Sequence, residues 1–167
     1  MTVDNLTIIQ IEDTIIHKQY VLNSALKMFK YLCTINKSEL GLELLKRATV
    51  HDNSKLEDDE LYLLSRLKDR KEAFTEATYT PDEITKMSIE EHWKRNRHHP
   101  EFFKDASEMT ELDILEMICD WHARSVQYNT DLLEFVKVRQ KNRFHFNKEM
   151  YSKIINYCKI LLKEDGN

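Results

Sequence analysis

The sequence predicts an all-α protein that folds as a single compact bundle of six or seven helices. Only two glycines and two prolines occur among 167 residues, whereas strand-rich folds need frequent turns. Apolar residues also recur at the spacing of a helix face, as in Val21, Ala25 and Met28. The length fits one domain over residues 1–167, with its helical core at about 12–163.

The first two helices are expected to lead directly to a pair of candidate ligands. A first helix is predicted at about 12–32, and Ser38 is a suitable N-cap for the second. His51 falls on the apolar face of this second helix. Residues 53–54, Asn-Ser, indicate a break that leaves Asp52 close to the helix C-terminus.

The middle of the chain contains a short helix, an irregular stretch and a well-marked helix start. The core contacts expected of the short helix are Leu61, Leu64 and Leu67. Residues 69–79 have the least regular pattern and are interpreted as a loop or lid. Residues 80–83, Thr-Pro-Asp-Glu, combine an N-cap Thr, Pro at the first helical position and an acidic third position. The helix that follows should reach about Arg97 and end near Pro100.

Three further helices complete the predicted bundle. Thr110 and Asp113 indicate the start of the next helix, which carries the apolar positions around residue 118. The last two helices are expected at 131–141 and 147–163.

The composition excludes several classes of protein. A formal net charge of −4 offers no basic face for duplex nucleic acid. No apolar run approaches membrane-spanning length, and the first ten residues do not resemble a signal peptide. The cysteines are odd in number and lie in apolar helical patterns, so they are interpreted as reduced core thiols of a cytoplasmic protein. They are Cys33, Cys119 and Cys158.

The His51-Asp52 doublet is the first candidate metal-binding element. Imidazole and carboxylate bind Zn, Mn or Fe, and the carboxylate can bridge to a second ion. Chance alone supplies such a dipeptide about half the time in a chain with seven histidines. The apolar position of His51 favours a ligand role, because a buried imidazole needs a partner.

Asp120 and His17 are the next candidates. Asp120 lies within an apolar helical stretch, and a buried carboxylate needs either a metal or a cationic partner. Arg124, one turn later, is the cationic alternative. His17 lies in mid-helix among apolar neighbours, where a single histidine is more often a hydrogen-bonded core residue than a ligand.

Residues 92–99 are the densest cluster of histidines and basic residues. His92 and His99 are two turns apart, but Pro100 disfavours helical geometry at His99. Either His98 or His99 is therefore expected to project from the helix end toward a pocket. The basic residues between them are suited to an anionic substrate or to an ordinary surface helix. They are Lys94, Arg95 and Arg97, whereas His122 and His145 are interpreted as packing or surface residues.

The order of these candidates resembles the HD-domain phosphohydrolase superfamily. The matching residues are His17, the doublet His51-Asp52, His92 with His98 or His99, and Asp120. The surrounding strings more specifically resemble a phage and bacterial family of HD-like proteins of unknown function. These strings are His51-Asp52-x-Ser54-Lys55, His92-x-x-x-Asn96-x-His98-His99 and Asp120-Trp121-x-Ala123-x-Ser125.

The resemblance covers the chain from about residue 17 to the C-terminal helix, and it implies a metal centre. In that superfamily the first histidine, the doublet and the last aspartate hold one divalent ion. In its two-metal members, two additional histidines between the doublet and the last aspartate hold the second ion. The implied cofactor is one or two ions, which the sequence does not resolve among Mn, Fe, Co, Zn, Mg and Ni. Where relatives that cleave cyclic dinucleotides have a glycine after the doublet, this chain has Ser54.

The expected function is hydrolysis of a small nucleotide or another phosphoester through a metal-activated water. Asp52 and Lys55 are the expected catalytic residues, and Lys55, Arg95 and Arg97 are expected to bind the phosphate. Two alternatives stay open: a di-iron oxygenase on the same fold, and a non-catalytic protein that binds a nucleotide or another macromolecule. Assembly into a homo-oligomer is compatible with the sequence.

Overall fold

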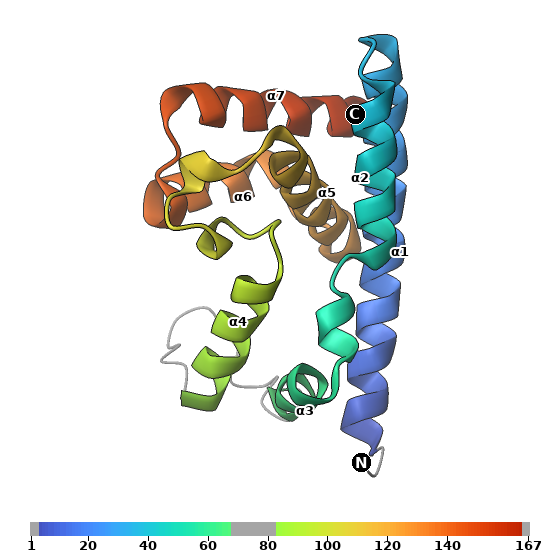
Figure 1. The fold of residues 1–167 in the computed structure, drawn as a ribbon, viewed down its shortest axis with the longest axis vertical. Coiled ribbons are helices and arrows are strands. Elements are labelled where there is room, and N and C mark those ends of the chain that lie inside the picture. Colours follow the sequence, from blue (N-terminus) through green and yellow to red (C-terminus); the bar gives the residue numbers. More distant parts are fainter. Residues whose placement is uncertain (1–3, 68–82, 165–167) are drawn as a thin grey trace.

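The structure, a computed structural model, describes residues 4–67 and 83–164. Within these residues it contains seven α-helices and no strand, which confirms the predicted all-α class (Figure 1). The α-helices are α1 (Asn5–Thr34), α2 (Ser38–Val50), α3 (Asp58–Leu67), α4 (Glu83–Arg95), α5 (Glu111–Tyr128), α6 (Leu132–Arg139) and α7 (Lys148–Glu164). The shorter turns are the 3-10 helices η1 (Asn53–Leu56), η3 (Pro100–Phe102) and η4 (Ala106–Glu108), and the π-helix η5 (Gln140–Phe144).

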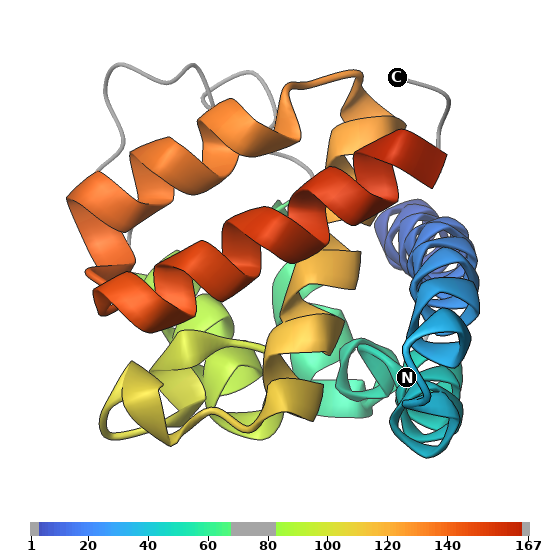
Figure 2. The same cartoon turned by 90° about the horizontal axis from the view of Figure 1, so that it is seen from above.

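The helix α5 lies at the centre of the bundle. The long helix α1 and its neighbour α2, which returns along it, pack on one side of α5 (Figure 1). On the other side α6 and α7 pack against it, and Figure 2 shows α7 crossing over α5. The pair α3 and α4 packs together near the N-terminal half of α1 (Figure 1). Side chains from α1, α4 and the turn after α2 can therefore reach toward α5.

The burial of α5 explains why its polar residues matter. Every residue from 113 to 123 is buried, so this helix is enclosed on all sides, as expected of a helix in the centre of a domain. Two of its buried residues, Glu116 and Asp120, are carboxylates four positions apart, a spacing that places them on the same helix face. Buried carboxylates require cationic or hydrogen-bonding partners, and these come from α1 and α2.

The predicted start of α5 is confirmed by a capping box between Thr110 and Asp113. Asp113 also accepts hydrogen bonds from Arg47 on α2, at 2.6 Å, and from Arg97, at 3.1 and 3.2 Å. Burial alone would raise the pKa of Asp113, but these partners outweigh it and lower the pKa to about 2. The carboxylate therefore fixes the start of α5 to α2 and to the segment after α4.

The first helix begins earlier than predicted. It starts at Asn5 rather than at about residue 12, because Asp4 caps it by accepting the backbone N–H of Thr7 at 2.9 Å. The second helix also differs by one position: Ser38 is its first residue, and Lys37 occupies the N-cap position.

The cysteine prediction was right for two of the three residues. All three are free, and Cys119 and Cys158 are buried. Burial raises the pKa of the Cys158 thiol to about 12, so this thiol is unreactive. Cys33 was wrongly placed in the core: it is exposed, because it lies in the last turn of α1 on the side away from the bundle.

The remaining boundaries agree with the predictions to within a few residues. Helix α4 ends at Arg95 rather than at about Arg97, and α6 begins after its N-cap residue Asp131. The predicted loop or lid at 69–79 and most of the predicted helix start at 80–83 lie outside the described residues. No described helix combines the length and the apolar character needed to cross a bilayer.

Candidate metal centre

All seven predicted metal ligands meet in two adjoining groups of side chains. In each group every residue offers one ligand atom, and these atoms lie within 4.8 Å of one another. One group comprises Asp52, His92, His98 and His99, and the other comprises His17, His51 and Asp120. All of them are buried except His99, which is half-buried. We refer to these seven residues as the His/Asp cluster.

The helices α1 and α5 supply one edge of the cluster. His17 projects from the middle of α1, and its Nε2 lies 2.8 Å from Oδ1 of Asp120 on α5. Its other ring nitrogen, Nδ1, lies 3.3 Å from the amide oxygen of Gln127. Arg124 is also near Asp120, at 3.9 Å from Oδ1. Asp120 therefore lies near the expected cation, Arg124, but its closer neighbour is His17, another candidate ligand.

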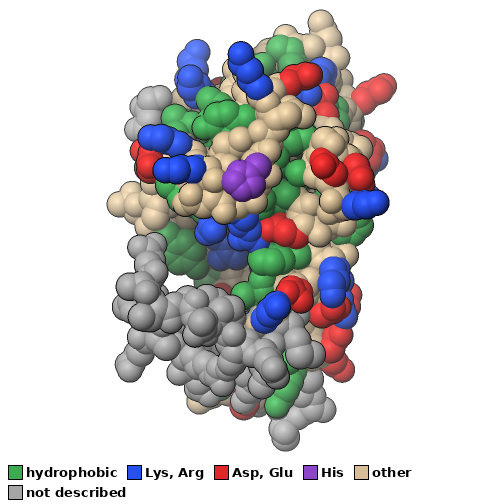
Figure 3. All heavy atoms as spheres, turned by 90° about the vertical axis from the view of Figure 1, so that its left-hand side faces the viewer, with side chains coloured by type: hydrophobic (Ala, Val, Ile, Leu, Met, Phe, Trp, Pro, Cys, Tyr) green, Lys and Arg blue, Asp and Glu red, His purple; other side chains and the backbone are tan. Residues whose placement is uncertain are grey.

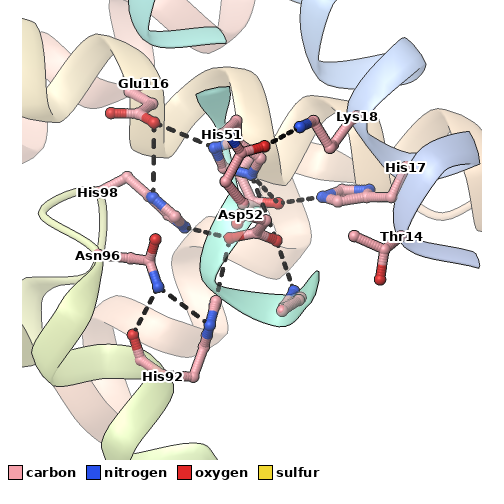
Figure 4. A network of polar contacts seen from close by, with 12 residues as sticks. Thr14, His17, Lys18, His51, Asp52, His92, Asn96, His98 and Glu116 are labelled. Carbon is pink, nitrogen blue, oxygen red and sulfur yellow. Dashed lines mark hydrogen bonds and ion pairs between the residues drawn. The ribbon is translucent and has the colours of Figure 1, made fainter. Parts of the chain in front are cut away.

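A sharp turn after α2 directs both residues of the doublet into the cluster (Figure 4). Neighbouring residues on a continuous helix point in different directions. Here α2 ends at Val50, His51 follows as the C-cap, and Asp52 adopts a left-handed backbone with φ 56°. Aspartate tolerates this conformation better than most residues. The result is that His51 Nε2 lies 3.5 Å from Asp52 Oδ2.

The end of α4 and the turn after it supply the remaining histidines. His92 lies in the last turn of α4, and its Nε2 is 3.3 Å from Asp52 Oδ1. The helix ends before His98, whose Nε2 reaches to 3.5 Å from the same oxygen. Both His98 and His99 lie in the cluster, whereas the sequence predicted that one or the other would. His99 Nε2 lies 3.0 Å from His92 Nε2.

Three ligand atoms of the cluster are buried without a hydrogen bond from any described residue. They are His51 Nε2, Asp52 Oδ1 and His98 Nε2. Such atoms are rare in folded proteins, because an unpaired buried polar atom costs free energy. Ligand atoms about 3.0–3.4 Å apart are what an ion with bonds of about 2.1 Å requires. Cations bound in the two groups would therefore give these three atoms the partners that they lack.

The opposite ring nitrogens are held by carboxylates. His92 Nδ1 lies 2.6 Å from Glu60 Oε1, and His51 Nδ1 lies 3.1 Å from Glu116 Oε1. A protonated Nδ1 that donates to a carboxylate leaves the Nε2 lone pair free toward the centre of the cluster. This is the usual arrangement of a metal-binding histidine.

Neither carboxylate was identified from the sequence. Glu116 carried a usable signal, since it lies one turn before Asp120 on a helix whose other positions are largely apolar. Glu60 carried none, because it follows Asp58 and Asp59 in an acidic first turn. Glu116 also forms a group with His51 and His98 that could hold an ion. An ion pair with Arg47 makes it better suited to orienting these histidines.

Burial keeps two histidines of the cluster neutral. It lowers the pKa of His98 to about 3, with a further contribution from the charge of His51. Burial likewise holds the pKa of His99 well below its usual value. Burial also acts to lower the pKa of His51, but Asp52 and Glu116 outweigh it and raise that pKa. A proton and a metal would therefore compete for His51.

The two aspartates of the cluster are ionised. Burial acts to raise the pKa of Asp52, but His51 and Lys55 outweigh it and hold that pKa well below its usual range. The pKa of Asp120 is also held well below its usual range, because the hydrogen bond and charge of His17 outweigh burial. Ionised carboxylates beside neutral imidazoles are the protonation state that metal binding requires.

Of the three predicted phosphate-binding residues, only Lys55 lies at the cluster. Its Nζ is 2.5 Å from Asp52 Oδ2. Arg95 points instead to the surface, where it pairs with Asp59 at 2.6 Å. Arg97 is held by the buried Asp113. Both arginines are therefore displaced from the predicted position, because carboxylates elsewhere hold them.

The two histidines that were not assigned to the site lie outside it. His122 is buried and its Nδ1 lies 2.8 Å from the hydroxyl of Ser24, a packing role as predicted. His145 is exposed after the π-helix η5.

Two cavities adjoin the cluster. The smaller, of about 180 Å³, reaches His17 and is lined by Lys55. The larger, of about 450 Å³, reaches His99 and Asp120. Arg124, which the sequence suggested only as a salt-bridge partner, lines both cavities.

The geometry predicts that Glu60 supports the cluster without binding an ion itself. Replacing Glu60 by glutamine should weaken metal binding by about 10- to 100-fold, because the charge that orients His92 is lost. Competition with a fluorescent chelator measures this affinity. Glu57→Gln is the matched control, since Glu57 is exposed and, among the described residues, pairs only with Arg95 at 3.3 Å. Equal affinities in the two variants would contradict the role of Glu60.

Comparison with known proteins identifies a family but no characterised relative. Residues 8–160 match the model of DUF5662, which is described as a family of unknown function. Neither a curated protein nor a solved structure matches the chain.

Proposed function

The chain belongs to the DUF5662 family, and from the geometry of the His/Asp cluster we propose that it is a metal-dependent phosphohydrolase with two divalent ions. The observation that carries the proposal is the position of Asp52. Its Oδ1 faces His92 and His98, whereas its Oδ2 faces His51. A carboxylate placed between two groups of histidines is suited to bridging a pair of ions.

The residues around the ions favour a phosphoester as the substrate. Lys55 and Arg124 both line the small cavity that reaches His17. Two basic side chains in a cavity of about 180 Å³ provide a site for a phosphate group and neutralise its oxygens. Divalent ions in such a pair lower the pKa of water toward neutrality and stabilise charge on the phosphate.

The order of ligands supports the same proposal. His17, the doublet His51-Asp52 and Asp120 come from three helical segments in the order typical of HD-domain phosphohydrolases, and all four are buried together. The protein is accordingly proposed to be an HD-like enzyme. Its free cysteines are in keeping with a cytoplasmic location.

The proposal is tested by metal analysis coupled to a substrate screen. Purified full-length protein should contain one or two divalent transition-metal ions per chain, measured by mass spectrometry. With Mn²⁺ or Co²⁺ added, it should release phosphate from, or cleave, at least one of a panel of mono-, cyclic and polyphosphate nucleotides. The proposal would be refuted if the purified protein contained no metal and, with Mn²⁺ or Co²⁺ added, hydrolysed no member of the panel. If the protein instead contained iron and consumed oxygen once the iron was reduced, the di-iron oxygenase alternative would replace the phosphohydrolase proposal.

A further inference from the structure

Most of the residues that line the larger cavity have no role in the proposed hydrolysis. Its volume is about 450 Å³, within the range of pockets that enclose small molecules. The cluster residues His99 and Asp120 line one part, and side chains of α4, α5, α6 and η5 line the rest. Figure 3 shows the side of the molecule that carries α4 and α6, with Lys and Arg side chains gathered above a hollow.

The cavity wall is rich in aromatic rings. Trp121 and Phe144 lie nearly parallel, at 15° with centroids 5.7 Å apart, and both line the cavity. Trp93 and Phe135 also line it. Flat aromatic surfaces of this kind bind planar groups such as nucleobases by stacking.

A cation in the same wall forms no ion pair with a carboxylate of the described part of the chain, although the charge of Glu101 acts on it. Arg139, on α6, makes no ion pair within that part of the chain, and its guanidinium lies 5.0 Å from the centroid of Phe135. The next arginine, Arg143, differs in that it pairs with Glu101. Burial and the neighbouring charge of Arg143 both lower the pKa of Arg139. A half-buried guanidinium in a cavity is suited to binding an anion.

The backbone between these residues is unusual. Helix α6 passes directly into the π-helix η5 at Gln140. Such turns are rare and often occur at functional sites. Here the π-helix carries Arg143 and Phe144, and both contribute to the cavity.

We propose that this cavity binds the non-reacting part of the substrate, a nucleobase together with a second phosphate group. The base stacks on the aromatic wall, and Arg139 pairs with the second phosphate while the first lies at the metal ions. The preferred substrates are thus nucleotides that carry at least two phosphate groups. This inference rests on the proposed phosphohydrolase function and specifies the substrate of the same site.

Intrinsic fluorescence tests the inference without requiring catalysis. The chain has two tryptophans, Trp93 and Trp121, and both line the cavity, so an occupant should change their emission. Full-length protein is mixed in a stopped-flow instrument with ADP, AMP or pyrophosphate, so that binding is measured before turnover. ADP should bind at least about tenfold more tightly than AMP, which lacks the second phosphate, or pyrophosphate, which lacks the base.

Variants test which side chains bind the second phosphate and which bind the base. Arg139→Met should weaken ADP binding about tenfold and leave AMP binding nearly unchanged. Lys137→Met is the matched control, since it removes one positive charge from the same helix at a residue whose ion pair in the described part of the chain is with Glu134. Phe144→Leu should weaken the binding of ADP and AMP but not that of pyrophosphate.

The two proposals fail in distinguishable ways. The inference is overturned if ADP binds no better than pyrophosphate, or if Arg139→Met and Lys137→Met bind ADP equally well. The inference would also be overturned if the protein hydrolysed simple phosphoesters equally well with and without a nucleobase. That result would leave the phosphohydrolase function intact. Selective ADP binding without hydrolysis of any phosphoester would instead refute the enzymatic function and retain the nucleotide site.

Discussion

Replacing Asp52 by asparagine should lower the rate of phosphoester hydrolysis by about a thousandfold or more. An amide has nearly the shape of a carboxylate, but it is neutral and offers a single oxygen. The two groups of histidines would then lose the charged residue between them, since Asp52 lies within 3.5 Å of His51, His92 and His98. Steady-state kinetics and metal content per chain should be measured on the same preparation, and we expect the metal content to fall.

The control for this variant is Asp105→Asn. Asp105 is exposed and its carboxylate caps the short helix η4, by accepting the N–H of Ser107 at 2.7 Å. Activity and metal content should match those of the unmodified protein. If Asp52→Asn retained both, Asp52 could not be the bridging ligand.

Removal of the metal should lower the melting temperature of the protein by about 10 °C. An ion that binds only the folded state at a concentration about a thousand times its Kd stabilises that state by about 4 kcal/mol. In a domain of this size, each kcal/mol corresponds to about 2–4 °C. The buried atoms that lack hydrogen bonds, such as His51 Nε2 and Asp52 Oδ1, are the ones that lose their partner on removal. Calorimetric scans before and after treatment with EDTA measure the difference.

Two histidine variants test whether this stabilisation comes from the cluster. His145→Gln alters an exposed histidine and should preserve the full effect of EDTA. His17→Gln removes a buried ligand candidate and should reduce that effect. A protein that loses its metal to EDTA at an unchanged melting temperature would contradict the assignment of the metal to this buried cluster.

The sequence was sufficient to predict which side chains meet in the His/Asp cluster, because several of them have an unusual local position. Asp120 lies in an apolar helical stretch, and His51 lies on an apolar face at a helix end. A polar residue at a position that the helix periodicity buries must have a partner, and this condition can be recognised without a structure. The helical fold followed in the same way from the scarcity of glycine and proline.

The groups around the ligands could not be predicted, since their roles depend on tertiary contacts. The charges of Arg95 and Arg97 are typical of a phosphate-binding site. In the structure, however, Asp59 pairs with the first and Asp113 with the second, away from the cluster. Arg139 lies forty positions after His99, yet both contribute to the same cavity. Local periodicity contains no information about which helix faces which. Charged side chains on half-exposed faces are therefore the least predictable part of the site.

The position of His92 at the end of α4 has a consequence for the architecture of the whole domain. Helix α4 packs on α3 and η1, and the centre of the bundle is formed by other helices. An ion shared by Asp52 and His92 would crosslink α4 to the turn after α2, as a disulfide does in proteins whose cysteines are paired. Unlike a disulfide, this link exists only in the folded state, so it stabilises that state through the free energy of metal binding. All cysteines of this chain are free. The ion would thus have a structural role as well as a catalytic one, and metal occupancy would determine how firmly α4 is held.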